Sequence, residues 1–250
     1  MIAESHDMRM LSLSLTKSQK QDLLMLLEEK ERRLLRNRLN TLYPATGPLS
    51  RDKYTKHLEF FTLGKQFNER ALFGGNRSGK TLAGCYEDTL HLTGLYPDWW
   101  PGHRFKKPVD GWIAGDTAKT VRDILQSTLI GPPGNPDAWG TGIIPGESIL
   151  RTTQKHGLPD AIETVFVRHE PTGGTSSLQF KSYDQGRETF QGTGQHLIHL
   201  DEDCSQDIYV ECFMRLMTTK GIIYWTATLV EGITALMLDF LPNLRPVPVE

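Results

Sequence analysis

The stretch ALFGGNRSGKT, residues 71–81, decides the fold. It fits the pattern G-x-x-x-x-G-K-[ST] and lies between an apolar run, 71–73, and a helical pattern that begins at Lys80. Glycines let the backbone turn its N–H groups around phosphate oxygens, and the helix that follows presents its positive N-terminal end to them. The stretch therefore predicts a phosphate-binding loop made of Gly74, Gly75, Asn76, Arg77, Ser78 and Gly79.

The two residues after this loop are expected to complete the nucleotide contacts. Lys80 would reach the β and γ phosphates, and Thr81 would hold Mg²⁺ through its hydroxyl. The pattern does not give the reaction, because kinases, GTPases, helicases and translocases all use this loop.

An acidic strand end is expected to form the other half of the site. The apolar run 197–200 leads directly into Asp201 and Glu202. Asp201 would bind Mg²⁺, directly or through water, and Glu202 would polarise the water that attacks the γ phosphate. Taken alone, the acidic pair could equally be a solvated turn after a strand. Together with the phosphate loop, it favours hydrolysis over phosphoryl transfer to a small acceptor.

Further polar positions are candidates for the catalytic machinery. Thr226 or Thr228, at the end of the apolar run 222–226, could sense the γ phosphate, although a hydroxyl closing a strand is also ordinary turn chemistry. An arginine is needed to stabilise charge in the transition state, and the candidates are Arg77 in the loop and Arg187. Sequence alone does not choose between these two arginines.

The remaining pattern alternates short apolar runs with helical stretches, which is typical of an α/β sheet. We expect strands at 71–73, 111–115, 164–167, 178–183, 197–200 and 222–226, and helices at 80–92, 117–129, 208–217 and 233–240. This order predicts a three-layer αβα P-loop NTPase with a mostly parallel sheet, of the additional-strand, RecA-like type.

Two regions flank or interrupt this pattern. The leucine-rich stretch 16–40 predicts an amphipathic helix that is docked on the body, or else acts as a lid or binds a partner. We therefore expect an N-terminal helical arm at 1–50 and the ATPase domain at 51–250. The Gly- and Pro-rich segment 131–160 predicts a long surface excursion.

Composition excludes several other classes of protein. The formal charge of −2, from 28 basic and 30 acidic residues, means that any DNA contact must be local. Three cysteines without a CxxC pair indicate reduced thiols rather than a disulfide framework or a zinc ribbon. The start lacks the basic region of a secretion signal, and the apolar span 221–241 is interrupted by Glu231 and Asp239, so no membrane segment is expected.

The ordered motifs resemble the ATPase domain of the large terminase subunit, the DNA-packaging motor of tailed bacteriophages, in its headful-packaging, short-tailed-phage form. The resemblance covers roughly residues 54–241. It is carried by ALFGGNRSGKT at 71–81, HLTGLYP at 91–97, SYDQGRETFQG at 182–192, LDE at 200–202 and TAT at 226–228.

This resemblance implies an Mg²⁺-dependent ATPase that drives viral double-stranded DNA into a procapsid in the cytoplasm of the infected bacterial host. The implied partners are double-stranded DNA, the portal protein, the small terminase subunit and further copies in a ring on the portal, with no membrane. Lys80 and Thr81 would bind ATP and Mg²⁺, and residues 226–228 would couple hydrolysis to movement. Arg187 becomes the first choice for an arginine finger acting across a subunit boundary, with Arg77 acting in cis as its rival.

Two departures from the family pattern matter. His57 stands where relatives carry a glutamine that reads adenine, so His57 becomes the candidate base-binding residue. Family members continue into a nuclease domain, whereas this sequence ends at Glu250, and no nuclease activity is expected from it. A helicase-like translocase and a nucleotide-gated assembly module without useful turnover are the alternatives. We also expect loss of the γ phosphate to release the segment after Thr228 and to move the helix 233–240.

Overall fold

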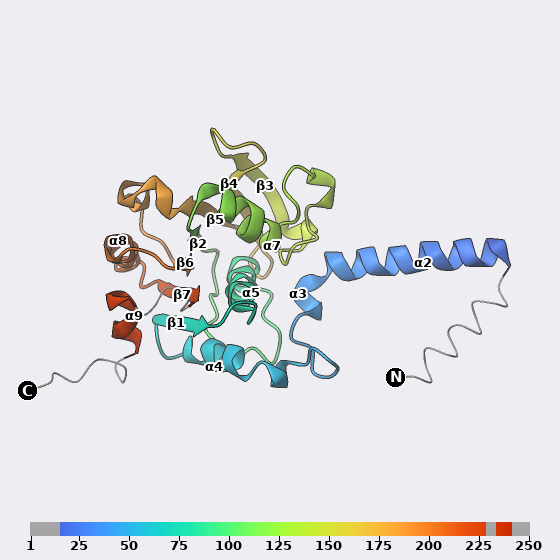
Figure 1. Ribbon diagram of the computed structural model, residues 1–250, viewed down its shortest axis with the longest axis horizontal. Helices are drawn as coiled ribbons and strands as arrows, with labels where there is room; N and C mark the ends of the chain where they lie inside the picture. The colour runs from blue at the N-terminus through green and yellow to red at the C-terminus, as the bar shows by residue number, and fades with distance from the viewer. Residues whose placement is uncertain (1–15, 229–233, 242–250) are drawn as a thin grey trace, which may run out of the picture.

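Seven strands form one sheet in the order β1-β7-β6-β2-β5-β4-β3 within the described residues, 16–228 and 234–241, of the computed structural model (Figure 1). The strands are β1 (Glu69–Gly74), β2 (Asp110–Gly115), β3 (Ile149–Gln154), β4 (Ile162–His169), β5 (Gly174–Ser182), β6 (Leu197–Asp201) and β7 (Ile222–Thr228). Short 3₁₀ turns occur at η1 (Arg51–Lys53), η3 (Pro136–Ala138), η4 (Gly146–Ser148), η5 (Tyr183–Gln185) and η6 (Arg187–Phe190).

The sheet is parallel from β1 through β5 and antiparallel at its other edge. β1, β7, β6, β2 and β5 pair in parallel, whereas β4 pairs antiparallel with both β5 and β3. β7 lies between β1, which leads into the phosphate loop, and β6, which ends in Asp201. This inserted strand is the feature of the additional-strand class, and the predicted fold class is confirmed.

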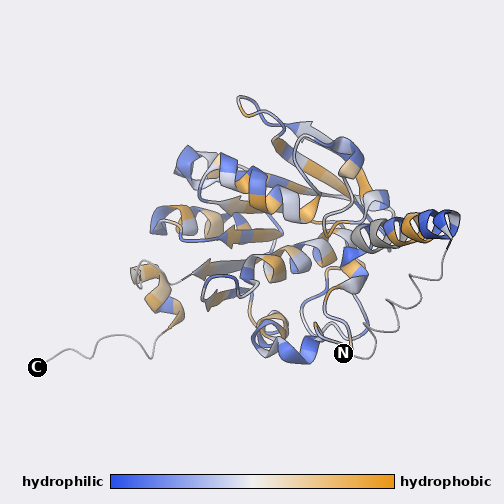
Figure 2. Cartoon of the chain, turned by 45° about the vertical axis from the view of Figure 1, so that its right-hand side comes forward, coloured by the Kyte–Doolittle hydropathy of each residue, from blue (hydrophilic) through white to orange (hydrophobic). Residues whose placement is uncertain are grey.

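Helices cover both faces of the sheet, because neighbouring residues along each strand point to opposite sides. Ile113 and Tyr224 belong to the cluster of buried residues that includes Ala83 of α5 (Lys80–Thr93). Trp112 and Trp225 belong to the second cluster, on the opposite face. The second cluster also contains residues of α8 (Gln206–Leu216) and α9 (Ala235–Phe240). Figure 2 shows apolar residues along the strands and along α5.

Two helical regions refine the sequence-based expectations. The predicted helix at 117–129 is present as α6 (Ala118–Thr120), a π-helical stretch η2 (Val121–Gln126) and α7 (Ser127–Leu129). Helix α4 (Thr55–Leu63), which the sequence analysis did not predict, packs beside β1 and carries His57 toward the phosphate loop.

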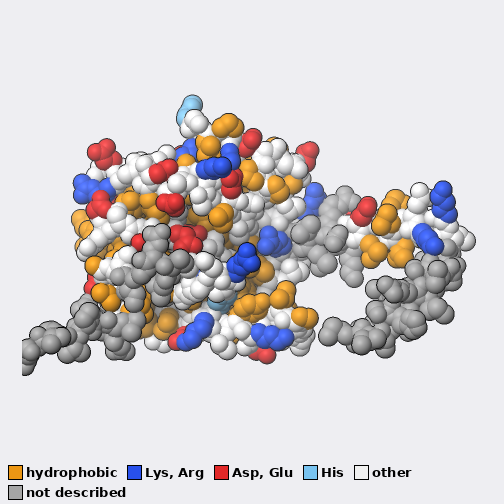
Figure 3. Space-filling model, viewed as in Figure 1, with side chains coloured by type: hydrophobic (Ala, Val, Ile, Leu, Met, Phe, Trp, Pro, Cys, Tyr) orange, Lys and Arg blue, Asp and Glu red, His pale blue; other side chains and the backbone are white. Residues whose placement is uncertain are grey.

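The N-terminal arm consists of α2 (Lys17–Arg36) and α3 (Arg38–Thr41). Figure 1 shows α2 projecting away from the sheet, and Figure 3 shows hydrophobic side chains exposed along it. Residues 23–27 are exposed by 44–67%, so the expectation of a docked helix is wrong for this part of the arm. Five consecutive apolar residues extend the exposed apolar surface around the helix axis beyond the leucine stripe. Leu39 of α3 is buried and anchors the arm.

The expectation of a long surface excursion at 131–160 is wrong for part of the segment. Ile143 and Ile144 are fully buried, and their backbone N–H groups donate to the carbonyls of Thr128 and Leu129. The same segment contains β3, which extends the sheet by pairing with β4. Backbone hydrogen bonds to α7 therefore hold this part of the segment in the core, although its Gly- and Pro-rich sequence shows no helical or strand periodicity.

The cysteines and the longer helices bear on two further points. All three cysteines are buried free thiols. Within 16–228 and 234–241, no helix is both long and apolar enough to cross a membrane.

Removal of a buried strand side chain tests where the core lies. Leu178 at the centre of β5 is fully buried, so Leu178→Ala should lower the free energy of unfolding by about 2–5 kcal/mol. Leu150 of β3 is 43% exposed, and Leu150→Ala should change it by about 0.5 kcal/mol or less. Urea unfolding followed by circular dichroism measures both variants, and equal losses would contradict the described core.

Candidate active site

The phosphate loop joins the end of β1 to the start of α5. Arg77 and Gly79 both have left-handed backbone conformations, with φ of 61° and 83°. At Gly74 an added Cβ would lie 3.2 Å from Ser78 Oγ, which is tighter than ordinary packing. Lys80 is buried, and its Nζ donates a hydrogen bond of 2.9 Å to the Gly75 carbonyl. The loop is therefore tightly turned, and the lysine contacts its interior.

Thr81 and Asp201 connect the two halves of the predicted site. Thr81 Oγ1 on α5 donates to Asp201 Oδ1 at the end of β6 over 2.9 Å. Asp201 is only 6% exposed. Burial raises the pKa of Asp201, opposed by the neighbouring His199 charge and by the hydrogen bonds from two threonines. A carboxylate and a hydroxyl are hard oxygen ligands, so this pair fits the ligand preference of Mg²⁺.

Glu202 lies beside this pair in a strained conformation. Its φ is 63°, which is uncommon for a residue other than glycine, and such strain concentrates at functional sites. The Trp225 indole donates to the Glu202 carbonyl over 2.6 Å, which helps to hold the backbone. The Glu202 carboxylate accepts from the backbone N–H and the hydroxyl of Thr228, at 3.2 and 3.3 Å. The structure thus brings Glu202 and Thr228 together.

A buried polar cluster extends beneath Asp201, and of its members the sequence analysis singled out Thr226 alone. Thr226 Oγ1 donates to Asp201 Oδ1 over 2.6 Å, and His199 contacts both Thr226 and Asp88. Tyr224 donates to the same Asp88. Burial lowers the pKa of His199, but the charge and hydrogen bond of Asp88, together with the charges of Asp201 and Glu87, raise it, so the net shift is upward. The only sequence signal was the presence of polar residues within otherwise apolar strands.

His57 contacts the phosphate loop from α4. Its Nε2 lies 3.1 Å from the Ser78 carbonyl and its Nδ1 lies 2.8 Å from the Tyr43 hydroxyl. The ring stacks on Tyr54 with centroids 5.4 Å apart. Burial lowers the pKa of His57, partly offset by the Ser78 carbonyl. Both ring nitrogens therefore already have partners within the protein.

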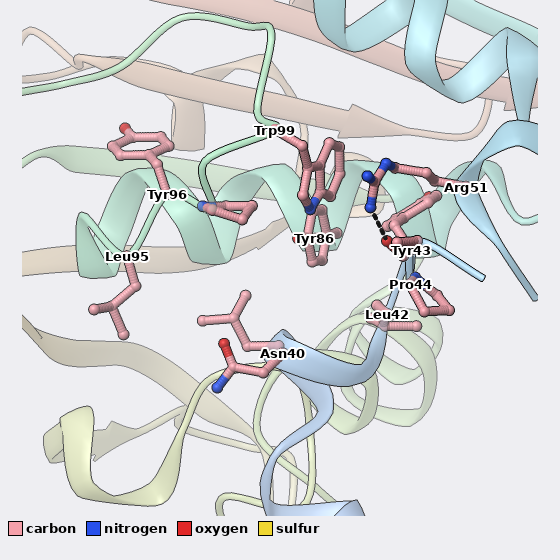
Figure 4. A pocket seen from close by; sticks show the side chains of 12 residues that line it. Asn40, Leu42, Tyr43, Pro44, Arg51, Tyr86, Leu95, Tyr96 and Trp99 are labelled. Atoms are coloured by element: carbon pink, nitrogen blue, oxygen red, sulfur yellow. Dashed lines mark hydrogen bonds between the residues drawn. The ribbon is translucent and has the colours of Figure 1, made fainter.

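Two cavities lie on either side of Tyr43. A cavity of about 310 Å³ borders the phosphate loop and is lined by residues that include Leu42, Tyr54, His57, Arg77 and Leu82. The other, of about 420 Å³, lies between α3 and α5 and is shown in Figure 4, where Tyr86 and Trp99 stack beside Tyr43. The first cavity adjoins the predicted site, whereas the second has no lining residue from the loop.

The two candidate arginines occupy different places. Arg77 is exposed within the phosphate loop. Arg187 is exposed in η6, which follows β5, on the other side of β6 from β1. The ends of β5 and β1 are four strand positions apart in the sheet, or about 19 Å at ordinary strand spacing. Arg187 also helps to lower the pKa of Asp207 at the start of α8, after a larger effect of the Ser205 hydroxyl.

The segment that carries Arg187 is anchored to the sheet. Lys181 Nζ donates to the Thr189 carbonyl over 2.5 Å and lies 4.4 Å from the centre of the Trp112 ring. The Tyr183 hydroxyl donates to the Asp201 carbonyl over 3.1 Å. These contacts connect the Arg187 segment to the acidic strand end.

A phosphate loop after β1, an acidic end on β6 and an inserted β7 between them define the class: this is a P-loop NTPase fold of the additional-strand type. Residues 71–249 match the family described as "Terminase large subunit, T4likevirus-type, N-terminal". The chain therefore belongs to the family of phage terminase large subunits, as the motifs predicted.

Known relatives are of the same kind. The chain is 32% identical over 206 residues to the terminase large subunit of Salmonella phage P22, and the match covers 76% of this chain and 41% of that protein. The chain thus spans less than half the length of this relative.

Solved structures of phage terminases are also similar. A mutant of the large terminase ATPase domain of Thermus phage P74-26 is 16% identical with a TM-score of 0.45, over 70% of this chain and 68% of that chain. The large terminase of a thermophilic bacteriophage, solved in complex with ADP, is 13% identical with a TM-score of 0.47, over 76% of this chain and 42% of that chain.

A glycine in α5 tests the close approach of the helix to β6. A Cβ at Gly84 would lie 2.3 Å from His199 Cε1, inside the buried cluster. Although Gly→Ala within a helix usually stabilises a protein, Gly84→Ala should instead lower the free energy of unfolding by about 1–3 kcal/mol. Gly146→Ala is the control, because its Cβ would meet only contacts of 3.4 Å or longer. A Gly84→Ala protein that melts at or above the wild-type temperature would contradict this packing.

Proposed function

We propose that this chain hydrolyses ATP with Mg²⁺ and that the hydrolysis powers translocation of viral double-stranded DNA into a procapsid. The observation that carries the proposal is the Thr81–Asp201 hydrogen bond of 2.9 Å, because it unites the phosphate loop with an acidic strand end. Glu202, the next residue, supplies the base that hydrolysis needs.

The residues of the chain would divide the work as follows. Lys80, which now contacts the Gly75 carbonyl, would instead bind the β and γ phosphates, and Thr81 and Asp201 would hold Mg²⁺. When bound there, Mg²⁺ would neutralise charge on the phosphates. Glu202 would orient the attacking water with the carboxylate lone pairs that its bonds from Thr228 leave free. Thr228 is thereby placed to link the state of the nucleotide to the position of Glu202.

The cavity of about 310 Å³ beside the loop is the proposed site for the adenine base. It offers the apolar side chains of Leu42 and Leu82 and the Tyr54 ring. Since both nitrogens of His57 are engaged, His57 supports the loop through Ser78 and borders the base. Base selection would then rest chiefly on shape and apolar contact.

The domain organisation and partners remain those proposed from the sequence. The proposed division is an N-terminal arm at 1–50 and an ATPase domain at 51–250, which would act in the cytoplasm of the infected host. Double-stranded DNA, the portal protein, the small terminase subunit and further copies in a ring are the proposed partners. The exposed apolar residues 23–27 on α2 support a partner-binding role for the arm.

Coupling to movement is proposed to pass from Thr228 to α9. Residues 229–233, which include the first residue of the predicted helix 233–240, lie outside the described residues. Helix α9 packs on β7 through Phe240, whose ring centroid is 6.0 Å from that of Trp225. Because Trp225 also bonds to the Glu202 carbonyl, a change at Glu202 has a direct physical route to α9.

Substitution of the proposed base tests the reaction. Glu202→Gln keeps the shape of the side chain but removes its basicity, so kcat should fall by about 10²–10⁴-fold while ATP still binds. Steady-state phosphate release, with and without double-stranded DNA, and nucleotide binding by calorimetry measure the two effects. ATP binding without turnover in the wild type under every condition would instead favour an assembly module.

The two arginines are distinguished by how turnover depends on neighbours. We expect Arg187→Ala to remove the rise of turnover with protein concentration or DNA, by about 10³-fold or more if Arg187 is the finger in trans. Basal turnover of the dilute protein should persist. Loss of turnover in dilute Arg77→Ala, with Arg187→Ala unaffected, would assign the finger to Arg77. If neither variant loses activity, both assignments are wrong.

A further inference from the structure

Helix α5 and strand β6 are joined at two levels by polar side chains. The upper contact is Thr81 to Asp201, at the proposed active site. The lower contact joins His199 Nδ1 to Asp88 Oδ2 over 2.7 Å. Asp88 is seven residues after Thr81 on α5, or about two helical turns. His199 is two residues before Asp201 on β6, so it lies on the same side of the sheet.

Thr226 of β7 connects the two levels. Its only hydroxyl hydrogen is donated to Asp201 Oδ1 over 2.6 Å, so its oxygen accepts from His199 Nε2 at 2.9 Å. The other ring nitrogen donates to Asp88, which also accepts from the Tyr224 hydroxyl over 2.5 Å. Both ring nitrogens of His199 thus act as donors, and the hydroxyls of Thr226 and Tyr224 donate to carboxylate oxygens.

Burial makes this chain of bonds rigid. Asp88, His199, Thr226 and Tyr224 are all 0% exposed, so water does not offer these groups alternative partners. The His199 ring also fills the space beside Gly84, where no Cβ fits. Asp88 therefore fixes the ring orientation, and the ring fixes the hydroxyl that contacts Asp201.

A metal-binding role for the same cluster is disfavoured. Donor atoms of Cys85, Asp88 and His199 lie within 4.8 Å of one another. However, both nitrogens of His199 and both oxygens of Asp88 are already engaged. Burial also raises the pKa of the Cys85 thiol well above its usual value, which opposes the thiolate that a metal would need.

We propose that Asp88 and His199 are positioning residues that orient the Asp201 carboxylate, through Thr226, for its role in the metal–nucleotide site. The relay is the chain of hydrogen bonds from Asp88 through His199 and Thr226 to Asp201. This inference rests on the proposed function, because it assigns the relay to the reaction in which Asp201 takes part. Partners of this kind, which hold a metal ligand without touching the metal, commonly affect affinity or activity by 10–100-fold. The hydrogen bonds that connect Asp88 to Asp201 run from α5 to β6, then to β7 and back to β6.

The test compares two neighbouring buried carboxylates of α5. Asp88→Asn keeps the side-chain shape but removes the negative charge that the His199 ring faces and leaves one acceptor atom in place of two. Glu87→Gln is the matched control: Glu87 is equally buried and its charge also acts on His199, but its hydrogen bonds go to Arg70 and His91. Both variants disturb a buried charge, and only Asp88→Asn changes a hydrogen bond to His199.

Two readouts separate positioning from general destabilisation. In Asp88→Asn, the affinity of the ADP-loaded protein for Mn²⁺, measured by loss of the free-ion electron paramagnetic resonance signal, should fall about tenfold or more. The kcat for ATP should fall by a similar factor, with KM changing less than about twofold. Glu87→Gln should lower the melting temperature but leave the Mn²⁺ affinity at the wild-type value.

Equal Mn²⁺ affinities in Asp88→Asn and Glu87→Gln would overturn the proposal. If Asp88→Asn does not fold, Thr226→Val removes the same link from the β7 side, and unchanged Mn²⁺ affinity in this variant would overturn it as well. Where both variants fold, the losses of Mn²⁺ affinity caused by Asp88→Asn and Thr226→Val should be non-additive in the double mutant, because both substitutions interrupt the same series of hydrogen bonds. If the wild type binds Mn²⁺ with ADP but never hydrolyses ATP, the proposed ATP hydrolysis is refuted. The relay is still tested in that case, because the Mn²⁺ affinities of the wild type and the variants can be compared without turnover.

Discussion

The hydrogen bond between Thr81 and Asp201 is the contact on which the rest of the site depends. It requires the N-terminus of α5 and the carboxyl end of β6 to meet, although β7 separates β6 from β1 in the sheet. The parallel order satisfies this requirement because it places the ends of β1, β7 and β6 at one edge. Gly84 then lets α5 lie against His199, so the two elements stay in contact for about two helical turns.

Several groups of the site are satisfied by partners inside the protein. Lys80 contacts the Gly75 carbonyl, and the Glu202 carboxylate contacts Thr228. The Lys80 bond would be exchanged for one to a phosphate when nucleotide binds, whereas the Glu202 oxygens keep free lone pairs beside Thr228. The positive φ of Arg77 and Glu202 places uncommon backbone conformations in the same two regions.

The sequence was sufficient for the parts of the site that are local in the chain. The phosphate loop is one continuous motif, and Asp201 with Glu202 follows a recognisable buried strand, so both could be placed by pattern alone. The relay was not predictable in this way, because Asp88, His199 and Tyr224 come from three elements and are ordinary residue types. Their association depends on the register of β6 against β7, in which His199 lies opposite Tyr224.

The errors in the fold have a similar origin. The leucine pattern of the arm predicts an amphipathic helix but does not say what its apolar side packs against, and residues 23–27 are exposed in the structure. Strand β3 was hidden in a Gly- and Pro-rich segment because its pairing with β4, across a turn, supplies its hydrogen bonds. In both cases tertiary contacts decide an outcome for which local propensity gives no signal.

The central claim is that Thr81 and Asp201 form one metal–nucleotide site with the phosphate loop. Its most direct test is calorimetric titration of ATP into the wild type and Asp201→Asn, each with Mg²⁺ and with a chelator. The account predicts that Mg²⁺ strengthens ATP binding to the wild type by about tenfold or more and has little effect on Asp201→Asn. Equal enhancement by Mg²⁺ in both proteins, or ATP binding to neither, would contradict it.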